Sequence, residues 1–309
     1  MPYSDKPLQD GSKINLLTPL HIRNSFDVKH FKTFAVSGMK SVIIAEAQGF
    51  CWGVRRALDI VNKRGAVSIL GDLIHNKQVV GELEGNGKKV IQEISIEEDR
   101  PIVITAHGTN IQNIRKIKKL DKKLVDTTCP LVSAIYKAGE QLEKEGYRVL
   151  IIGDKKHVEV IGIASRMDRP IIVNSEEELE LEQLPPKVGV ICQSTFSLTK
   201  FENLTNLIQQ RVLDVKIQNT ICHPTKKRQE AAEKLATKVE VMIVIGGFHS
   251  SNTKKLVELT RQYCESYHIE TANQLDFNWV KGKTEIGITA GASTADWVIQ
   301  EVYDTLISW

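Results

Sequence analysis

The sequence lacks any long hydrophobic run and any large excess of charge. Its apolar runs, of which 241–245 is among the longest, are far shorter than the roughly 20 residues that a transmembrane helix needs. The net charge is only +3, and the basic run at 115–123 contains no aromatic side chain, so nothing indicates binding to nucleic acid or to a membrane surface. Residues 1–30 contain no hydrophobic core of a secretion signal. We therefore expect a cytoplasmic protein that binds neither nucleic acid nor membranes.

Cysteine is scarce, and its spacing argues against the common cysteine motifs. The chain has five cysteines among 309 residues, and no two of them form a C-x-x-C pair. This spacing is unlike that of a zinc ribbon or a ferredoxin-type cluster. In a reducing compartment, an odd number of distant cysteines is more often free, metal-bound or catalytic than disulfide-bonded.

What the sequence does contain is an approximate internal repeat in three copies, beginning near Val42. Each copy has a run of residues typical of a strand that ends in a cysteine: Cys51, Cys129 or Cys222. Later in each copy an apolar run closes on a glycine, and a histidine follows within four residues. The repeat predicts an N-terminal extension at 1–41 and three modules at 42–122, 123–217 and 218–309.

The pattern inside each copy predicts an α/β fold. After Cys51, the apolar residues Val54, Ala57, Leu58 and Val61 have the spacing of one helix face. Strands that alternate with helices indicate parallel sheets, in which ligands bind at the carboxyl ends of the strands. We expect three similar modules in a pseudo-threefold (trefoil) arrangement around a central metal cluster, with one cysteine from each module facing the centre.

The three repeated cysteines are candidate metal ligands. Each stands at a turn from a strand to a helix, and a helix N-terminus favours the thiolate form. Zinc with a bound water is one possibility, and a [4Fe–4S] cluster with one iron open to substrate is another. Packing at a buried turn is the alternative for each cysteine, but the repeat favours ligation. Cys192 and Cys264 fall outside the repeat, and we expect them only to pack.

Histidines and hydroxyl groups at the predicted strand ends indicate an anionic ligand. His75, His107 and His157 follow strands at equivalent edges. Probable helix starts carry the candidate phosphate-binding residues Ser194, Ser250, Ser251, Asn252 and Ser293. Such residues often only cap helices, as the spacing of Ser293 and Asp296 suggests, but free N–H groups at helix N-termini also bind phosphate. Several of them at one place would suit a diphosphate.

Glu159 is the candidate proton donor. It lies two residues after His157 and has no obvious helical partner. A carboxyl group in a partly dry site has a raised pKa and can deliver a proton. The alternative is a glutamate on the surface.

Taken together, these residues resemble the 4-hydroxy-3-methylbut-2-enyl diphosphate reductase family of the non-mevalonate isoprenoid pathway, over roughly residues 42–305. The motifs that carry the resemblance are Gly49-Phe50-Cys51, His75-Asn76, Ala106-His107-Gly108, Thr128-Cys129-Pro130, His157 with Glu159, Gln193-Ser194-Thr195, Cys222 with Arg228, Ser250-Ser251-Asn252 and Ala290-Gly291-Ala292-Ser293. The chain has Val158 where the family commonly has proline, and Ser194 where it has threonine.

The resemblance implies a [4Fe–4S] cluster held by Cys51, Cys129 and Cys222. It implies a diphosphate bound by His75, His107, His157, Ser250, Ser251, Asn252 and Ser293. Glu159 and the Ser194 hydroxyl would manage the proton, and the products would be isopentenyl and dimethylallyl diphosphate. A ferredoxin or flavodoxin would supply the electrons.

Two other functions remain open from the sequence. One is a non-redox lyase or hydratase that uses the open iron only as a Lewis acid. The other is a sensor that binds a metal and a diphosphate without turnover. An acid at Glu159 beside a hydroxyl at Ser194 favours catalysis over binding alone.

Overall fold

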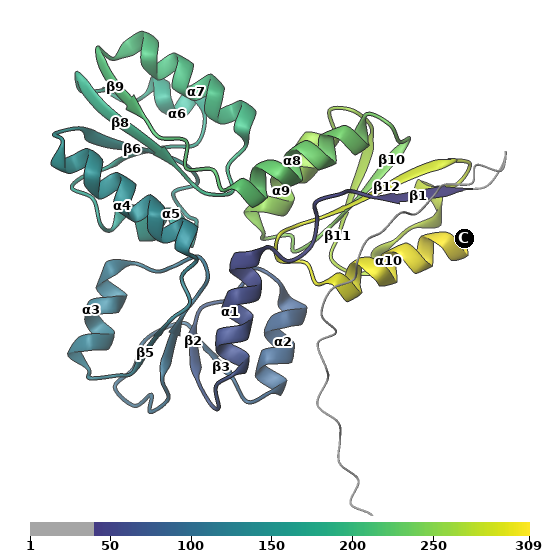
Figure 1. Ribbon diagram of the computed structural model, residues 1–309, viewed down its shortest axis with the longest axis horizontal. Helices are drawn as coiled ribbons and strands as arrows, with labels where there is room; N and C mark the ends of the chain where they lie inside the picture. Colours follow the sequence, from purple (N-terminus) through teal and green to yellow (C-terminus); the bar gives the residue numbers. More distant parts are fainter. Residues whose placement is uncertain (1–39) are drawn as a thin grey trace, which may run out of the picture. The chain divides into compact units, whose positions relative to one another are not determined.

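The computed structural model describes residues 40–309, which form one compact unit of three lobes (Figure 1). The predicted extension at 1–41 therefore lies outside the described residues, except for Lys40 and Ser41. No helix within residues 40–309 has the length and apolar character that crossing a membrane requires.

Each lobe is built on one sheet of four strands. In lobe 1 the strand order is β3 (Lys89–Ile91), β2 (Ser68–Leu70), β4 (Ile102–Ile104) and β5 (Leu124–Asp126). In lobe 2 it is β7 (Ile171–Val173), β6 (Arg148–Ile152), β8 (Lys187–Cys192) and β9 (Asp214–Ile217). In lobe 3 it is β1 (Ser41–Ile44), β12 (Glu285–Ala290), β10 (Val241–Ile245) and β11 (Glu265–Ile269). Every pair of neighbouring strands is parallel, which confirms the predicted α/β fold.

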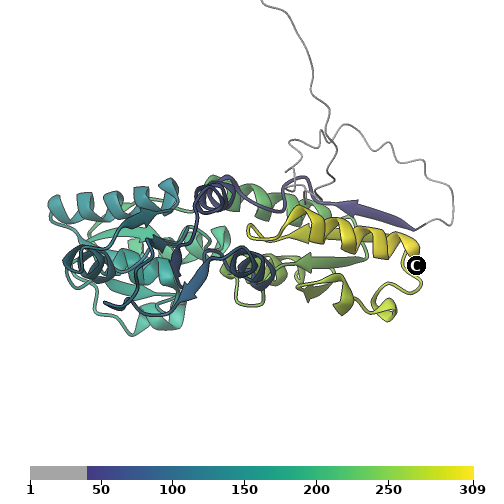
Figure 2. The same cartoon turned by 90° about the horizontal axis from the view of Figure 1, so that it is seen from below.

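Helices cover the faces of the sheets. Lobe 1 has α1 (Trp52–Asn62), α2 (Lys77–Gly85) and α3 (Ile111–Lys119). Lobe 2 has α4 (Pro130–Lys144), α5 (Val158–Ala164), α6 (Glu176–Glu180) and α7 (Leu198–Arg211). Lobe 3 has α8 (His223–Ala236), α9 (Ser251–Thr260), the short 3₁₀ turns η1 (Ala272–Gln274) and η2 (Phe277–Trp279), and α10 (Asp296–Ser308). The side view in Figure 2 shows these helices on both sides of the strands.

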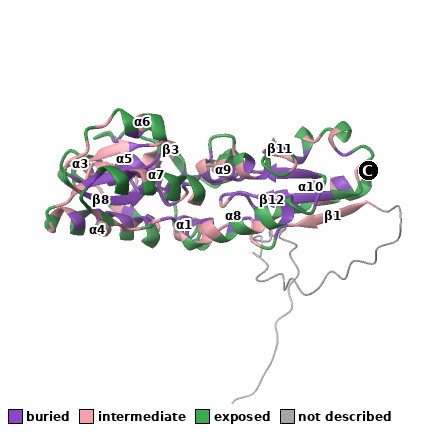
Figure 3. Ribbon diagram, turned by 90° about the horizontal axis from the view of Figure 1, so that it is seen from above, coloured by how far each residue is buried: buried purple, intermediate pink, exposed green. Residues whose placement is uncertain are grey.

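The central strands are almost entirely apolar because they are covered on both faces. All five residues of β10 are fully buried, and so are Val149 to Ile152 in β6. The strands β8 and β12 are likewise buried over most of their length (Figure 3). Burying one Val, Leu or Ile side chain stabilises a fold by roughly 1.5–3 kcal/mol, so each sheet has its own hydrophobic core. The strand ends, where the apolar runs stop, are thereby held in fixed positions.

Two strands belong to different lobes from those that the sequence repeat suggested. We expected residues from 42 onward to belong to the first module and residues from 123 onward to the second. Instead β1 pairs with β12 in lobe 3, with Val42 opposite Ile286, and β5 pairs with β4 in lobe 1. The reason is edge pairing: β12 and β4 would otherwise present unpaired backbone groups at the edges of their sheets. Whether the lobes also fold as separate domains remains a prediction.

This arrangement makes the chain change lobes three times, always at a repeated cysteine. The strands β1, β5 and β9 each complete the sheet of one lobe, and the next helix along the chain, α1, α4 or α8, belongs to the following lobe. The turn between strand and helix contains Cys51, Cys129 or Cys222. Each repeated cysteine is thus at a crossing between lobes, where two lobes meet. The three helices that follow the cysteines run along the same face of the molecule in Figure 3.

Candidate functional site

The three repeated cysteines cap the three helices that begin at the lobe crossings. Cys51, Cys129 and Cys222 are the N-cap residues of α1, α4 and α8, each with an extended backbone. Proline in the first turn of α4 and of α8 suits these starts because its missing N–H would have no partner there. Each sulfur therefore lies at the positive end of a helix dipole, as the sequence predicted.

The structure brings the sulfurs of Cys51 and Cys129 together. A β-carbon added to Gly53 would lie 2.6 Å from the Cys129 sulfur and 3.9 Å from the Cys51 sulfur, so only glycine fits between them. Burial raises the pKa of the Cys129 and Cys222 thiols, and the nearby charge of Cys51 raises both further. All described cysteines are free thiols.

The other two cysteines have ordinary packing environments. Cys192 is fully buried at the end of β8, 3.7 Å from the Thr220 hydroxyl, and Cys264 contacts Ser266. Neither lies at a lobe crossing.

The arrangement does not suit one isolated metal ion. Within residues 40–309, no three His, Cys, Asp or Glu side chains converge closely enough to hold a single ion. In a four-iron cluster each thiolate binds a different iron, so its ligands need not converge on one point.

The three predicted histidines form one cluster. The rings of His75 and His107 are stacked with centroids 4.3 Å apart, and the His157 ring stands edge-on at 5.3 and 5.7 Å. Burial lowers the pKa of all three, that of His157 to about 4, so the rings are neutral at pH 7 in this state. His75 Nε2 and His107 Nδ1 are buried without hydrogen-bond partners. Such unsatisfied groups cost roughly 1–3 kcal/mol each, and a bound anion would satisfy them.

Lobe 3 contributes the predicted hydroxyl and amide groups. Ser250 caps α9, and Ser251 forms hydrogen bonds with Gln193 and Thr195 of lobe 2. Asn252 is only 4% exposed, and neither polar atom of its side chain has a hydrogen-bond partner. A buried amide with no partner indicates a polar ligand at this point.

Ser293 joins lobe 3 to the His75 loop through two hydrogen bonds between a side chain and a backbone carbonyl. The Asn76 side-chain amide donates to the Ser293 carbonyl (2.8 Å), and the Ser293 hydroxyl donates to the carbonyl of His75 (3.2 Å). Asn76 was not among the predicted site residues. Its sequence position, directly after His75 and at the N-cap of α2, is typical of an ordinary cap, which it also is.

Glu159 is buried, so the surface alternative for this residue is wrong. It lies in the first turn of α5 and is only 1% exposed. Its two carboxylate oxygens accept hydrogen bonds from the Ser194 N–H (2.6 Å) and the Ser194 hydroxyl (2.7 Å). Burial raises the pKa of the Glu159 carboxyl, and the two hydrogen bonds from Ser194 oppose this only in part. The pair is therefore an acid and a hydroxyl in a dry environment.

Tyr136 fixes the position of the His107 loop and of α5 relative to each other. Its hydroxyl occupies the space that a β-carbon would need at Gly108, which has a φ of +80°, and at Gly162, where the distance would be 2.9 Å. The Arg166 guanidinium lies 3.8 Å above the ring. Burial raises the pKa of Tyr136 to about 12, so the hydroxyl stays protonated. This role could not be predicted from the sequence, because it depends on two distant glycines.

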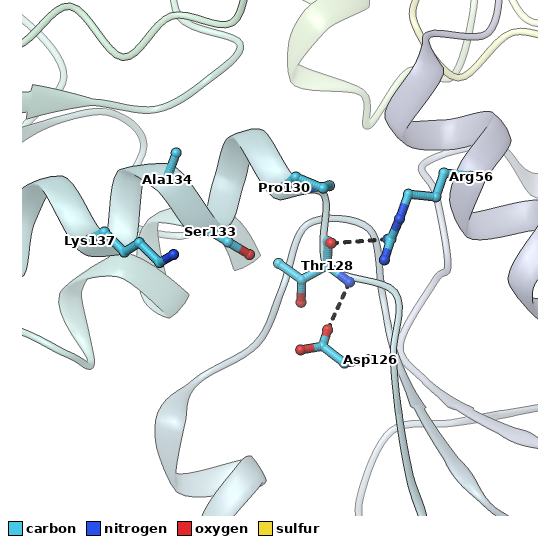
Figure 4. A pocket seen from close by; sticks show the side chains of 7 residues that line it. All are labelled: Arg56, Asp126, Thr128, Pro130, Ser133, Ala134 and Lys137. Carbon is cyan, nitrogen blue, oxygen red and sulfur yellow. Dashed lines mark hydrogen bonds between the residues drawn. The ribbon is translucent and has the colours of Figure 1, made fainter.

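A surface hollow of about 410 Å³ lies beside Cys129 (Figure 4). Arg56 of α1 donates to the carbonyls of Thr127 and Thr128, and Asp126 accepts from the Thr128 N–H. These bonds hold the loop before Cys129. The remaining lining residues are Pro130, Ser133, Ala134 and Lys137, and none of them is a predicted site residue.

Fold and site together define a three-lobed α/β protein with a shared centre of thiols, histidines and one buried acid. The family described as LytB protein matches residues 42–307. The chain belongs to this family.

Relatives and solved structures agree with this membership. A 4-hydroxy-3-methylbut-2-enyl diphosphate reductase from Alkaliphilus oremlandii is 40% identical over 276 residues, 86% of this chain and 98% of that protein. A reductase of the same name from Helicobacter pylori is 39% identical over 263 residues, 84% of this chain and 96% of that protein. A solved structure of the E-1-hydroxy-2-methyl-but-2-enyl-4-diphosphate reductase from Plasmodium falciparum matches with a TM-score of 0.82 and 29% identity, covering 87% of this chain and 88% of that one. A second structure, of (E)-4-hydroxy-3-methyl-but-2-enyl diphosphate reductase, matches with a TM-score of 0.64 and 37% identity over 88% of this chain and all of that one.

Proposed function

We propose that this chain is an oxidoreductase that converts (E)-4-hydroxy-3-methylbut-2-enyl diphosphate into isopentenyl diphosphate and dimethylallyl diphosphate. The relatives and the family membership support this activity. The observation that carries the proposal is the position of Glu159: its carboxylate is bonded to Ser194, and the Ser194 carbonyl accepts a hydrogen bond from the Cys222 N–H (3.0 Å). A buried acid thus lies beside one of the cysteines that would hold the redox group.

The residues at the centre fit a [4Fe–4S] cluster. Cys51, Cys129 and Cys222 would bind three irons, one from each lobe crossing. The cluster would supply electrons and one iron open to substrate as a Lewis acid. Exposed side chains follow two of the ligands within two residues, Trp52 after Cys51 (59% exposed) and Leu131 after Cys129 (41% exposed). They offer a contact to an electron donor, which we propose is a ferredoxin or a flavodoxin.

The diphosphate would bind among the unsatisfied groups of the three lobes. The residues that we assign to it are His75, His107, His157, Ser250, Ser251, Asn252 and Ser293. His75 and Asn252 carry buried polar atoms without partners, and a diphosphate has enough acceptor oxygens to satisfy their N–H groups.

Glu159 and Ser194 would manage the proton at the allylic end of the substrate. The reaction consumes two electrons and two protons, breaks the C–O bond of the hydroxyl and releases water. One proton goes to the departing hydroxyl and the other to the allyl carbon skeleton. The Glu159 carboxyl, whose pKa burial raises, would hold the proton to be delivered, and the Ser194 hydroxyl is bonded to it (2.7 Å) and can pass that proton on.

The dependence on a reductant tests this function against a lyase or hydratase. Anaerobically purified protein should be brown, carry about four irons per chain, and release both isoprenoid diphosphates only when dithionite and a redox mediator are present. Turnover without reductant would support the non-redox alternative. Tight binding of the substrate without any product would support the sensor.

Diphosphate affinity should rise as the pH falls below neutral. The histidine rings are neutral in the free protein because burial lowers their pKa, to about 4 for His157. An anion favours the charged ring and raises that pKa, so binding takes up a proton, and affinity increases as the pH falls through the pKa of the bound state. Calorimetry with inorganic diphosphate measures this effect.

A pair of variants assigns the effect to the cluster of histidines. His157→Gln should flatten the pH dependence and weaken binding by about 10- to 150-fold, since one charged-group hydrogen bond contributes roughly 1.5–3 kcal/mol. His223→Gln changes an exposed histidine on α8 and should leave the parent pH dependence intact. Equal pH dependence in parent and His157→Gln would contradict the assignment.

A further inference from the structure

Arg228 on α8 is a buried charge without a counter-ion. The residue is only 6% exposed. Its Nη2 donates to the Gly49 carbonyl (2.6 Å) and its Nη1 to the Pro224 carbonyl (2.9 Å), while Nε has no partner. No carboxylate within residues 40–309 forms an ion pair with it. A buried guanidinium in this condition needs a negative charge nearby.

The groups that can supply this charge are the cysteines. Arg228 lies on the helix that Cys222 caps, and its Nη2 reaches the carbonyl two residues before Cys51. Burial lowers the pKa of the guanidinium, and the charges of Cys51 and Cys222 raise it. The positive charge therefore lies between two of the three ligand loops.

Arg56 provides a comparison within the same chain. Like Arg228, it lies on a helix that begins after a repeated cysteine, here α1 after Cys51. It also donates to the loop before another repeated cysteine, at the carbonyls of Thr127 and Thr128 before Cys129. Unlike Arg228, it lines a hollow that is open to solvent (Figure 4). Water screens its charge more strongly than that of Arg228, which is only 6% exposed.

We propose that Arg228 is the counter-charge of the iron–sulfur cluster and raises its reduction potential. This inference rests on the proposed function. Three thiolates around a dipositive core leave one net negative charge, and the electron that dithionite supplies adds a second. A fixed positive charge in a dry place stabilises the reduced state more than the oxidised state. Removing it therefore makes reduction harder.

Three variants test the inference through the midpoint potential, followed by electron paramagnetic resonance during a dithionite titration. Arg228→Gln keeps a hydrogen-bond donor but removes the charge. We expect the equilibrium constant for one-electron reduction of the cluster to fall about tenfold in this variant, which lowers the midpoint potential by about 59 mV. Arg228→Lys keeps the charge and should stay close to the parent. Arg56→Gln, the solvent-screened control, should shift much less than Arg228→Gln.

Iron and sulfide contents, measured on the same samples, separate the possible outcomes. Normal iron with an unchanged potential in Arg228→Gln would overturn the inference while leaving the proposed function intact. Loss of iron in both Arg228→Gln and Arg228→Lys would overturn it too, because Arg228 would then serve as a clamp on the Gly49 loop. A parent protein without iron would overturn the proposed function as well as the inference.

Discussion

Replacing Glu159 by glutamine is expected to lower turnover by about 10²–10⁴, the usual contribution of a positioned acid, while iron content and substrate affinity stay at parent values. Glutamine has nearly the same shape as glutamate. Its carbonyl can accept the bond from the Ser194 N–H, and its amide can donate to the Ser194 hydroxyl, so the buried hydrogen bonds that Glu159 makes can be replaced. What glutamine cannot do is release a proton. Steady-state kinetics, iron analysis and substrate titration on the same sample measure the three quantities.

Ser194 supplies the matched controls for this experiment. Ser194→Thr keeps a hydroxyl beside Glu159 and should retain most of the activity, whereas Ser194→Ala removes the hydroxyl and should lose much of it. Turnover of Glu159→Gln near the parent rate would mean that the proton comes from another group. Loss of iron in that variant would mean that Glu159 supports the cluster rather than the proton transfer.

Cys129→Ser should lose most of its iron and with it nearly all activity. Cys129 caps α4 at the crossing from lobe 1 to lobe 2, and its sulfur packs against Gly53 beside Cys51. A serine oxygen at this position is a poorer iron ligand than thiolate sulfur. The visible absorption of anaerobically purified protein and its iron content measure the loss.

Cys192→Ser is the control because it changes a cysteine that is buried in lobe 2 away from the crossings. Its sulfur lies near the Thr220 hydroxyl, which can also bond to a serine, so the fold should persist and the iron should remain. Normal iron in Cys129→Ser together with loss of iron in Cys192→Ser would show that Cys192, and not Cys129, is a cluster ligand. Equal loss in both would indicate a general effect on folding.

The features that the sequence repeat predicted are those with a local cause. A strand that ends at a small residue and a helix that begins at a cysteine are encoded within about ten residues, so Cys51, Cys129 and Cys222 could be placed at helix starts. The closeness of His75 and His107 followed from the same reasoning, because they follow two parallel strands of one sheet, whereas His157 follows β6 of lobe 2.

The features that the repeat could not predict depend on distant partners. The apolar run in β1 has the composition of a strand in any of the three sheets, and only the open edge of β12 decides where it pairs. The burial of Glu159 depends on Ser194, which lies on another strand end. The role of Arg228 depends on Gly49, 179 positions away. None of these pairings leaves a periodic pattern in the sequence.

The pairing of β1 with β12 has a consequence for the synthesis of the protein. Of the described elements, β1 leaves the ribosome first, and β12 is followed only by α10. Ser41 therefore cannot pair with Glu285 until nearly the whole chain has been made. The turn that carries Cys51 is fixed at one end by this pair and at the other by α1. Lobes 1 and 2 can form their sheets while the chain is still growing, but the first ligand loop is fixed last. We therefore expect iron to be loaded into the completed chain and not into the nascent one.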